Sequence, residues 1–120
     1  GVAAIAVSGG STPGRFFQAL GKTKDIDWSK VLVTLVDERW VDETSDRSNA
    51  LLVNERMLQG PAATARFLPL YSGGDEPDME AVNKTNSLLQ HFICNRFFQS
   101  HYCRSLLMTY FRLFYLIQCL

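Results

Sequence analysis

The first 90 residues alternate between short apolar runs and amphipathic stretches. The runs VAAIAV (2 to 7) and KVLVTLV (30 to 36) are continuous, which is typical of buried parallel strands. RFLPLY (66 to 71) predicts a short third strand. Pro69 favours an edge position for it, because proline has no backbone N–H to donate. The sequence therefore predicts three strands separated by other elements.

The stretch PGRFFQAL after the first run predicts a helix, with Thr12 as its N-cap, the proline at its first position and Gly21 as its stop. Phe16, Phe17 and Leu20 fall on one side of this helix and are expected to face a core. The helix would begin where the first polar loop ends.

Two further helices are predicted. SNALLVNERMLQGP (48 to 61) should open at Ser48 or Asn49 and stop at the Gly60-Pro61 pair. Its candidate core residues are Leu51, Leu52, Met57 and Leu58. MEAVNKTNSLL (79 to 89) is the other, preceded by a loop SGGDEPD. Strands that alternate with helices predict an α/β domain with a parallel sheet.

Residues 91 to 120 have a different composition. They contain both histidines, all three cysteines and no acidic residue, glycine or proline. The longest apolar stretch is 15 residues and includes Arg112, whereas a bilayer span needs roughly 20. One interpretation is a core or interfacial helix, with apolar residues at helical spacing at Leu106, Tyr110, Leu113 and Ile117. We favour the other, a non-native or frame-shifted tail after a domain at 1 to 90.

Charge and cysteine usage exclude several function classes. The 12 basic and 12 acidic residues cancel, so we expect neither nucleic acid nor a membrane as a partner. Cys94, Cys103 and Cys119 match neither a metal-binding spacing nor a disulfide framework. No secretory signal is evident in the first residues. A cytoplasmic protein with reduced thiols and no metal is the expectation.

The loop Ser8-Gly9-Gly10-Ser11-Thr12 leaves the first strand and enters a helix. Glycines let an anion approach backbone N–H groups, the hydroxyls of Ser11 and Thr12 add donors, and the helix dipole favours negative charge. The loop matches neither a Walker loop nor GxGxxG. A phosphate cradle and a strand-to-helix turn without ligand are equally good interpretations of this loop alone.

A second polar cluster, DERWVDETSDRSN (37 to 49), follows the second strand. Arg39 has the donor geometry to hold a phosphate or carboxylate. Asp37 would orient Arg39, position a water or bond a sugar hydroxyl. Alone, the charged triplet would be a solvated loop, but the carboxyl ends of parallel strands share one sheet edge, where ligands bind. The two clusters together therefore predict a site.

Three segments together, SGGSTP (8 to 13), DWSKVLVTLVDERWV (27 to 41) and DRSN (46 to 49), resemble the N-terminal half of the 6-phosphogluconolactonases. The resemblance covers roughly residues 2 to 75. Related sugar-phosphate isomerases typically have DEY and SY where this chain has Asp37-Glu38-Arg39 and Ser48-Asn49, so the lactonases are the better match.

The resemblance implies a Rossmann-like three-layer α/β/α fold, incomplete here, that hydrolyses 6-phospho-D-glucono-1,5-lactone to 6-phospho-D-gluconate in the oxidative pentose phosphate pathway. No cofactor or metal is implied, and the partner is a small phosphorylated sugar lactone. The substrate-binding residues that it implies are Gly9, Gly10, Ser11, Thr12, Asp37, Arg39, Ser48 and Asn49.

The catalytic residue is unknown. In the family the base is a histidine within a later stretch of the form GMGxDGHTASLFP, which this chain lacks. His91 and His101 have none of the glycines, Asp and Thr of that motif. We therefore expect little lactonase activity from this chain alone, and a non-catalytic sugar-phosphate-binding module is the alternative.

Overall fold

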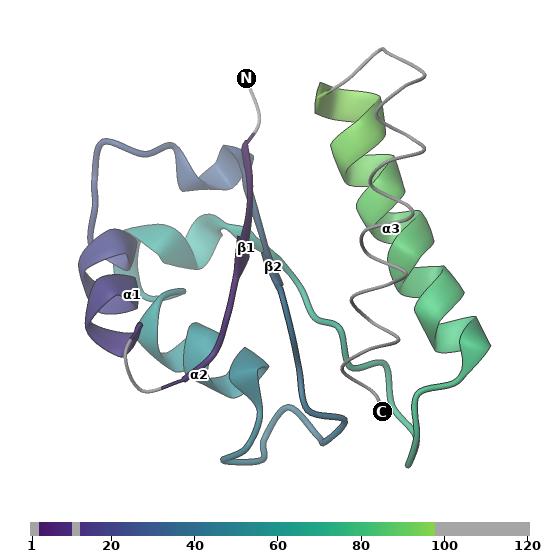
Figure 1. Ribbon diagram of the computed structural model, residues 1–120. Coiled ribbons are helices and arrows are strands. Elements are labelled where there is room, and N and C mark those ends of the chain that lie inside the picture. The colour runs from purple at the N-terminus through teal and green to yellow at the C-terminus, as the bar shows by residue number, and fades with distance from the viewer. Residues whose placement is uncertain (1–2, 11–12, 98–120) are drawn as a thin grey trace. The chain divides into compact units, whose positions relative to one another are not determined.

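The computed structural model describes residues 3–10 and 13–97 and divides into two units, Gly1–Gly73 and Gly74–Leu120. The first unit contains a three-stranded sheet in the order β1-β2-β3. Its strands are β1 (Ala3–Val7) and β2 (Val31–Leu35), both labelled in Figure 1, and β3 (Arg66–Leu68). All three predicted strands are confirmed, and β3 lies at an edge as Pro69 indicated.

Both strand pairs are parallel. Ala3 lies opposite Val31 and Val7 opposite Leu35, while the shorter β3 pairs Arg66 with Leu32. The carboxyl ends of β1 and β2 therefore meet at one edge of the sheet. The described sheet is a partial α/β fold, and the predicted parallel arrangement is confirmed.

The two long apolar runs differ in burial. Every residue of β2 is buried, as predicted. In β1 only Val7 is buried, and Ala3, Ala4 and Ala6 are exposed. The prediction of a buried first strand is therefore wrong for the described structure. The reason is position: β1 forms one edge of the described sheet and has a strand on one side only.

Two helices, α1 (Gly14–Gly21) and α2 (Asn49–Arg56), lie on the same side of this sheet (Figure 1). The second helical layer of the expected three-layer arrangement stays a prediction. Phe17 of α1 is buried, whereas Phe16 is 59% exposed. Consecutive residues point about 100° apart on a helix, so the expectation that both rings face the core is wrong. The largest fully buried side chains of the described core are Phe17, Val33, Leu35, Val53 and Met57.

Gly21 ends α1, as predicted, but for a reason other than a left-handed conformation, since its φ is not positive. A Cβ at Gly21 would collide with the backbone carbonyl of Met57. The glycine therefore lets the end of α1 approach the chain that follows α2. Thr12, the expected N-cap, lies outside the described residues. Pro13 precedes the helix with helical dihedrals, and its carbonyl accepts a hydrogen bond from the N–H of Phe17.

Ser48 is the N-cap of α2, and its Oγ accepts a hydrogen bond from the N–H of Leu51 at 3.2 Å. The helix ends at Arg56, earlier than the predicted stop, and Gly60–Thr64 forms a separate 3-10 helix, η2. Of the four predicted core residues only Met57 is buried. The three leucines are half-buried, and Ala50 and Val53 supply the buried face instead.

A second 3-10 helix, η1 (Trp28–Lys30), precedes β2. Trp28 is buried, and its indole Nε1 donates to the carbonyl of Thr23 at 2.9 Å. This hydrogen bond links η1, just before β2, to the segment just after α1, and so closes the connection between the helix and the strand.

In the second unit, α3 (Met79–Phe97) follows a loop in which Gly73 and Gly74 have positive φ. The helix includes the predicted stretch 79 to 89 and continues through residue 90. The domain boundary expected there falls inside α3 and stays a prediction. Within 3–10 and 13–97, no helix has the length and apolarity needed to cross a membrane. His101, Cys103 and Cys119 lie outside the described residues.

Candidate functional site

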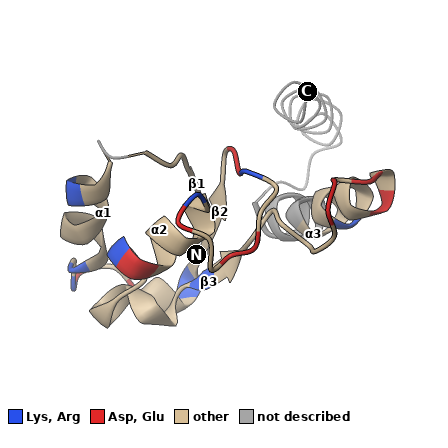
Figure 2. Cartoon of the chain, turned by 90° about the horizontal axis from the view of Figure 1, so that it is seen from below, with Lys and Arg blue, Asp and Glu red and all other residues tan. Residues whose placement is uncertain are grey.

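The predicted site residues converge at the carboxyl edge of the sheet in the first unit. The loop after β1 carries Gly9 and Gly10, the loop after β2 carries Asp37 and Arg39, and α2 begins at Asn49. Ser11 and Thr12 lie outside the described residues. Viewed from below in Figure 2, positive and negative residues are interspersed over the loops, in keeping with the zero net charge.

Asn49 is the centre of the site. Its side chain is buried, with 2% of the residue exposed. The amide Nδ2 donates to the Asp37 carbonyl at 3.0 Å and to Asp37 Oδ2 at 3.2 Å. Its Oδ1 accepts from Arg39 Nη1 at 2.6 Å. Asp37 thus orients Arg39 through Asn49, so one of the three predicted roles of Asp37 is realised indirectly.

Gly9 brings the loop after β1 against this amide. A Cβ at Gly9 would overlap the side-chain amide of Asn49. Gly10 has a φ of 117°, a conformation that side chains other than glycine's rarely adopt. The two glycines therefore serve different ends: Gly9 allows a close approach, and Gly10 allows the turn.

Glu38 holds the site together, and the sequence did not predict this role. Its carboxylate accepts from the N–H of Asn49 at 2.7 Å and of Ala50 at 2.8 Å. It also accepts from Ser48 Oγ at 3.1 Å and from the N–H of Arg39 at 2.9 Å. A carboxylate at a helix N-terminus satisfies free N–H groups and interacts favourably with the helix dipole. The N-terminus of α2 therefore already holds an anion, which belongs to the chain itself.

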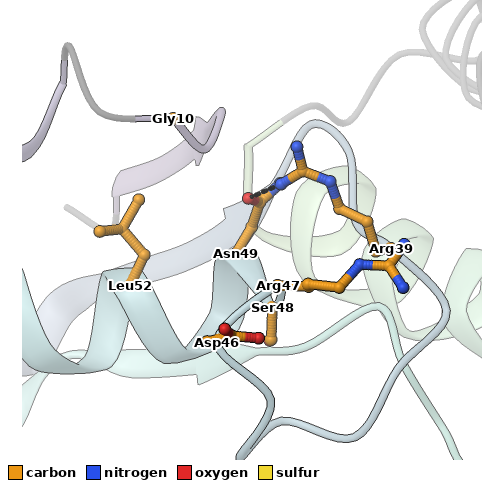
Figure 3. A pocket seen from close by; sticks show the side chains of 7 residues that line it. All are labelled: Gly10, Arg39, Asp46, Arg47, Ser48, Asn49 and Leu52. Carbon is orange, nitrogen blue, oxygen red and sulfur yellow. Dashed lines mark hydrogen bonds between the residues drawn. The ribbon is translucent and has the colours of Figure 1, made fainter.

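A pocket of about 450 Å³ opens beside this network. Its lining, shown in Figure 3, is Gly10, Arg39, Asp46, Arg47, Ser48, Asn49 and Leu52. Four of the seven are predicted substrate-binding residues. The sequence did not predict that Asp46, Arg47 and Leu52 line the pocket, although Asp46 and Arg47 belong to the DRSN motif.

The pocket carries two guanidinium groups and one carboxylate. Arg39 and Arg47 are exposed at its rim. Among residues 3–10 and 13–97, neither of these two arginines forms an ion pair. One Nη of Arg39 is engaged by Asn49, and its remaining donors are available to a ligand. The arrangement suits a small anion.

The loop that leads to the pocket contains two acidic residues with opposite pKa shifts. The Thr44 hydroxyl, with the Thr44 N–H, lowers the pKa of Asp42 by donating to Oδ1 at 2.6 and 2.9 Å. Burial raises the pKa of Glu43, and the carboxylates of Asp42 and Glu38 add to this. Repulsion between carboxylates therefore adds to the effect of burial at Glu43, whereas hydrogen bonds dominate at Asp42.

Comparison with known proteins identifies the class. The family model described as glucosamine-6-phosphate isomerases/6-phosphogluconolactonase matches residues 1–101. The chain belongs to this family. The match continues past residue 75, so the family-like segment is longer than the sequence motifs indicated, and the first eleven residues of the expected tail lie within it.

Two family members that share extensive sequence with the chain are named 6-phosphogluconolactonase. The protein of Rhizobium meliloti is 52% identical over 82 residues, which are 68% of this chain and 35% of the relative. That of Mesorhizobium japonicum is 58% identical over 71 residues, which are 59% and 29% of the two chains. The chain thus spans about a third of the length of these relatives.

A solved family structure has the same fold over the matched part. The crystal structure of a 6-phosphogluconolactonase from Shewanella baltica superposes with a TM-score of 0.71 at 41% identity. The superposition covers 76% of this chain and 38% of that one. The sheet described here is therefore part of the larger α/β sheet of the family.

Proposed function

We propose that this chain supplies the sugar-phosphate-binding portion of a 6-phosphogluconolactonase. The reaction is hydrolysis of 6-phospho-D-glucono-1,5-lactone to 6-phospho-D-gluconate in the oxidative pentose phosphate pathway. The observation that carries the proposal is the linked set Asp37–Asn49–Arg39 at the edge of the pocket. It presents a fixed guanidinium to an anionic ligand at the sheet edge where α/β proteins bind substrates. The proposed setting is cytoplasmic, without a cofactor.

Lactone hydrolysis needs a base that activates water and donors that stabilise the oxyanion on the carbonyl. Donors are present: the free N–H groups of Arg39 face the pocket, and a buried Asn49 holds the guanidinium in place. The described pocket lining contains no histidine. We therefore assign substrate binding to these residues and assign the proton transfer to none of the described lining residues.

The alternative is a sugar-phosphate-binding module without catalysis. It is favoured by the same observation, a pocket with anion-binding donors and no base in its described lining. The two proposals differ in turnover and agree in binding.

The test measures both properties on the 120-residue chain. We expect 6-phosphogluconate to bind in titration calorimetry and Arg39→Ala to weaken it at least about tenfold, as for loss of a charge-assisted hydrogen bond. Arg15→Ala, an exposed arginine outside the pocket lining, is the control. Absence of binding by the unaltered chain would contradict both proposals. Lactone turnover above the spontaneous rate would exclude the non-catalytic module.

A further inference from the structure

Arg47 lines the pocket with a side chain that has no described partner. It directly precedes Ser48, the N-cap of α2 (Figure 3). Its backbone N–H donates to Ser45 Oγ at 3.3 Å. Within the part of the chain that the structure describes, its guanidinium forms neither a hydrogen bond nor an ion pair. An arginine that lines a pocket and is not paired with a carboxylate there retains all its donors for a ligand.

The acidic groups near Arg47 do not neutralise it, because they hydrogen-bond other groups or are fewer than the arginines of the pocket. The Glu38 carboxylate accepts the N–H groups of Asn49 and Ala50 at the start of α2. Asp37 Oδ2 accepts from the Asn49 amide. Asp46 lines the same pocket without an ion pair to either arginine among the described residues. Two guanidiniums against one carboxylate leave the pocket positive.

We infer that Arg47 is a second phosphate-binding arginine, which acts with Arg39 on the phosphate of the sugar phosphate. The inference rests on the proposed function and specifies which end of the ligand this pocket receives. A phosphate monoester is close to doubly charged near neutral pH and accepts several charge-assisted hydrogen bonds, so two guanidiniums match it better than one. A carboxylate, with a single charge, needs only one.

Position supports the same assignment. Ser48 and Asn49, the two residues that follow Arg47, are buried and bonded to Glu38. The backbone next to Arg47 is therefore fixed. The Arg47 side chain extends from this fixed backbone to the pocket. Arg39 enters the same pocket from the loop after β2, held by Asn49. The two cations thus come from separate segments that the Glu38 bonds join.

The test titrates the 120-residue chain with 6-phosphogluconate, inorganic phosphate and gluconate. Arg47→Gln should weaken 6-phosphogluconate and phosphate about tenfold each and leave gluconate unchanged, because gluconate lacks the phosphate. Arg47→Lys should recover part of the affinity, since it retains the charge without the two-pronged donor geometry. Arg56→Gln, which removes an exposed arginine near the other end of α2, is the matched control and should alter nothing.

The outcomes separate this inference from the proposed function. Equal 6-phosphogluconate affinity for Arg47→Gln and the unaltered chain would overturn the inference and leave the proposed function standing. Phosphate binding that depends on Arg47, with 6-phosphogluconate no tighter than phosphate, would support the inference and count against the proposed function. Failure of the unaltered chain to bind either phosphorylated probe would overturn both.

Discussion

The two loops that form the pocket are built in different ways. The loop after β2 is fastened to α2 by side-chain bonds from Asp37, Glu38 and Arg39. The loop after β1 meets the same helix through Gly9, which contributes backbone and a close approach. β2 is buried along its whole length, whereas β1 is mostly exposed. Hydrogen bonds therefore hold the loop after β2 in place, whereas the loop after β1 packs closely against Asn49 because Gly9 has no side chain.

This comparison predicts the largest effect at Gly9. A Cβ in Gly9→Ala overlaps the buried amide of Asn49, and moving this amide would break its hydrogen bonds to Arg39 and Asp37. Overpacking of this kind costs about 1–3 kcal/mol. We also expect loss of 6-phosphogluconate binding by at least about tenfold, because displacing Asn49 releases Arg39. Urea unfolding and calorimetry measure the two effects.

Gly14→Ala is the control for this substitution. A Cβ at Gly14 meets nothing within 4 Å, and the residue lies in the first turn of α1. Alanine has the better helix propensity by about 1 kcal/mol, so stability should stay equal or rise and binding should not change. Equal stability and affinity in the two alanine variants would show that the approach of Gly9 to Asn49 has no role.

The next effect is expected on the other loop, at Glu38. Glu38→Gln keeps the shape and removes the charge that accepts the N–H groups of Asn49 and Ala50. Hydrogen bonds to charged groups contribute about 1.5–3 kcal/mol, so we expect a loss within that range in urea unfolding. Affinity for 6-phosphogluconate should fall with it, since the same carboxylate accepts from the N–H of Arg39.

Glu55→Gln provides the comparison for Glu38. It removes an exposed carboxylate near the end of α2, away from the pocket lining. Surface substitutions of this type change stability by less than about 0.5 kcal/mol. If Glu38→Gln proved as mild as Glu55→Gln, the hydrogen bonds of the loop after β2 would not be what fixes that half of the site.

The same contrast explains what the sequence could predict. Gly9, Asp37 and Arg39 follow apolar runs, and parallel pairing brings the ends of those runs together, so the edge that carries the site followed from local pattern. The role of Glu38 did not, because its partners Asn49 and Ala50 lie 11 and 12 residues later and meet it only when the loop closes. Arg47 was within a quoted motif, but the sequence does not show that its carboxylate neighbours are engaged elsewhere.

The burial of β1 was misjudged for a similar reason. AAIAV and VLVTL are both apolar, yet one is exposed and the other buried. Apolar side chains allow a strand to be buried, but the number of neighbouring strands decides how far it is buried. β2 has neighbours on both sides, and β1 has one. A single sequence contains no signal for the difference.

The smallest expected effect concerns the acidic turn of the loop after β2. The pKa of Glu43 is raised by burial and by the carboxylates of Asp42 and Glu38. A carboxyl whose folded-state pKa is raised binds its proton more tightly when folded, so its ionisation destabilises the fold above its ordinary pKa of 4.5. Glu43→Gln should therefore raise the urea midpoint slightly at pH 7, and the gain should vanish as the pH falls below that value.

Asp42 should show the opposite sign. Its pKa is lowered by the Thr44 hydroxyl and N–H, so its ionised form stabilises the fold above the ordinary pKa of 3.8, and the contribution disappears as the pH falls below it. Asp42→Asn should thus lower the urea midpoint slightly at pH 7. Opposite shifts for the two neighbours would mean that the turn balances one favourable and one unfavourable charge. A lower midpoint for both variants would mean that repulsion and burial at Glu43 are too weak to destabilise the fold, and a higher midpoint for both would mean that repulsion outweighs the Thr44 hydrogen bonds at Asp42.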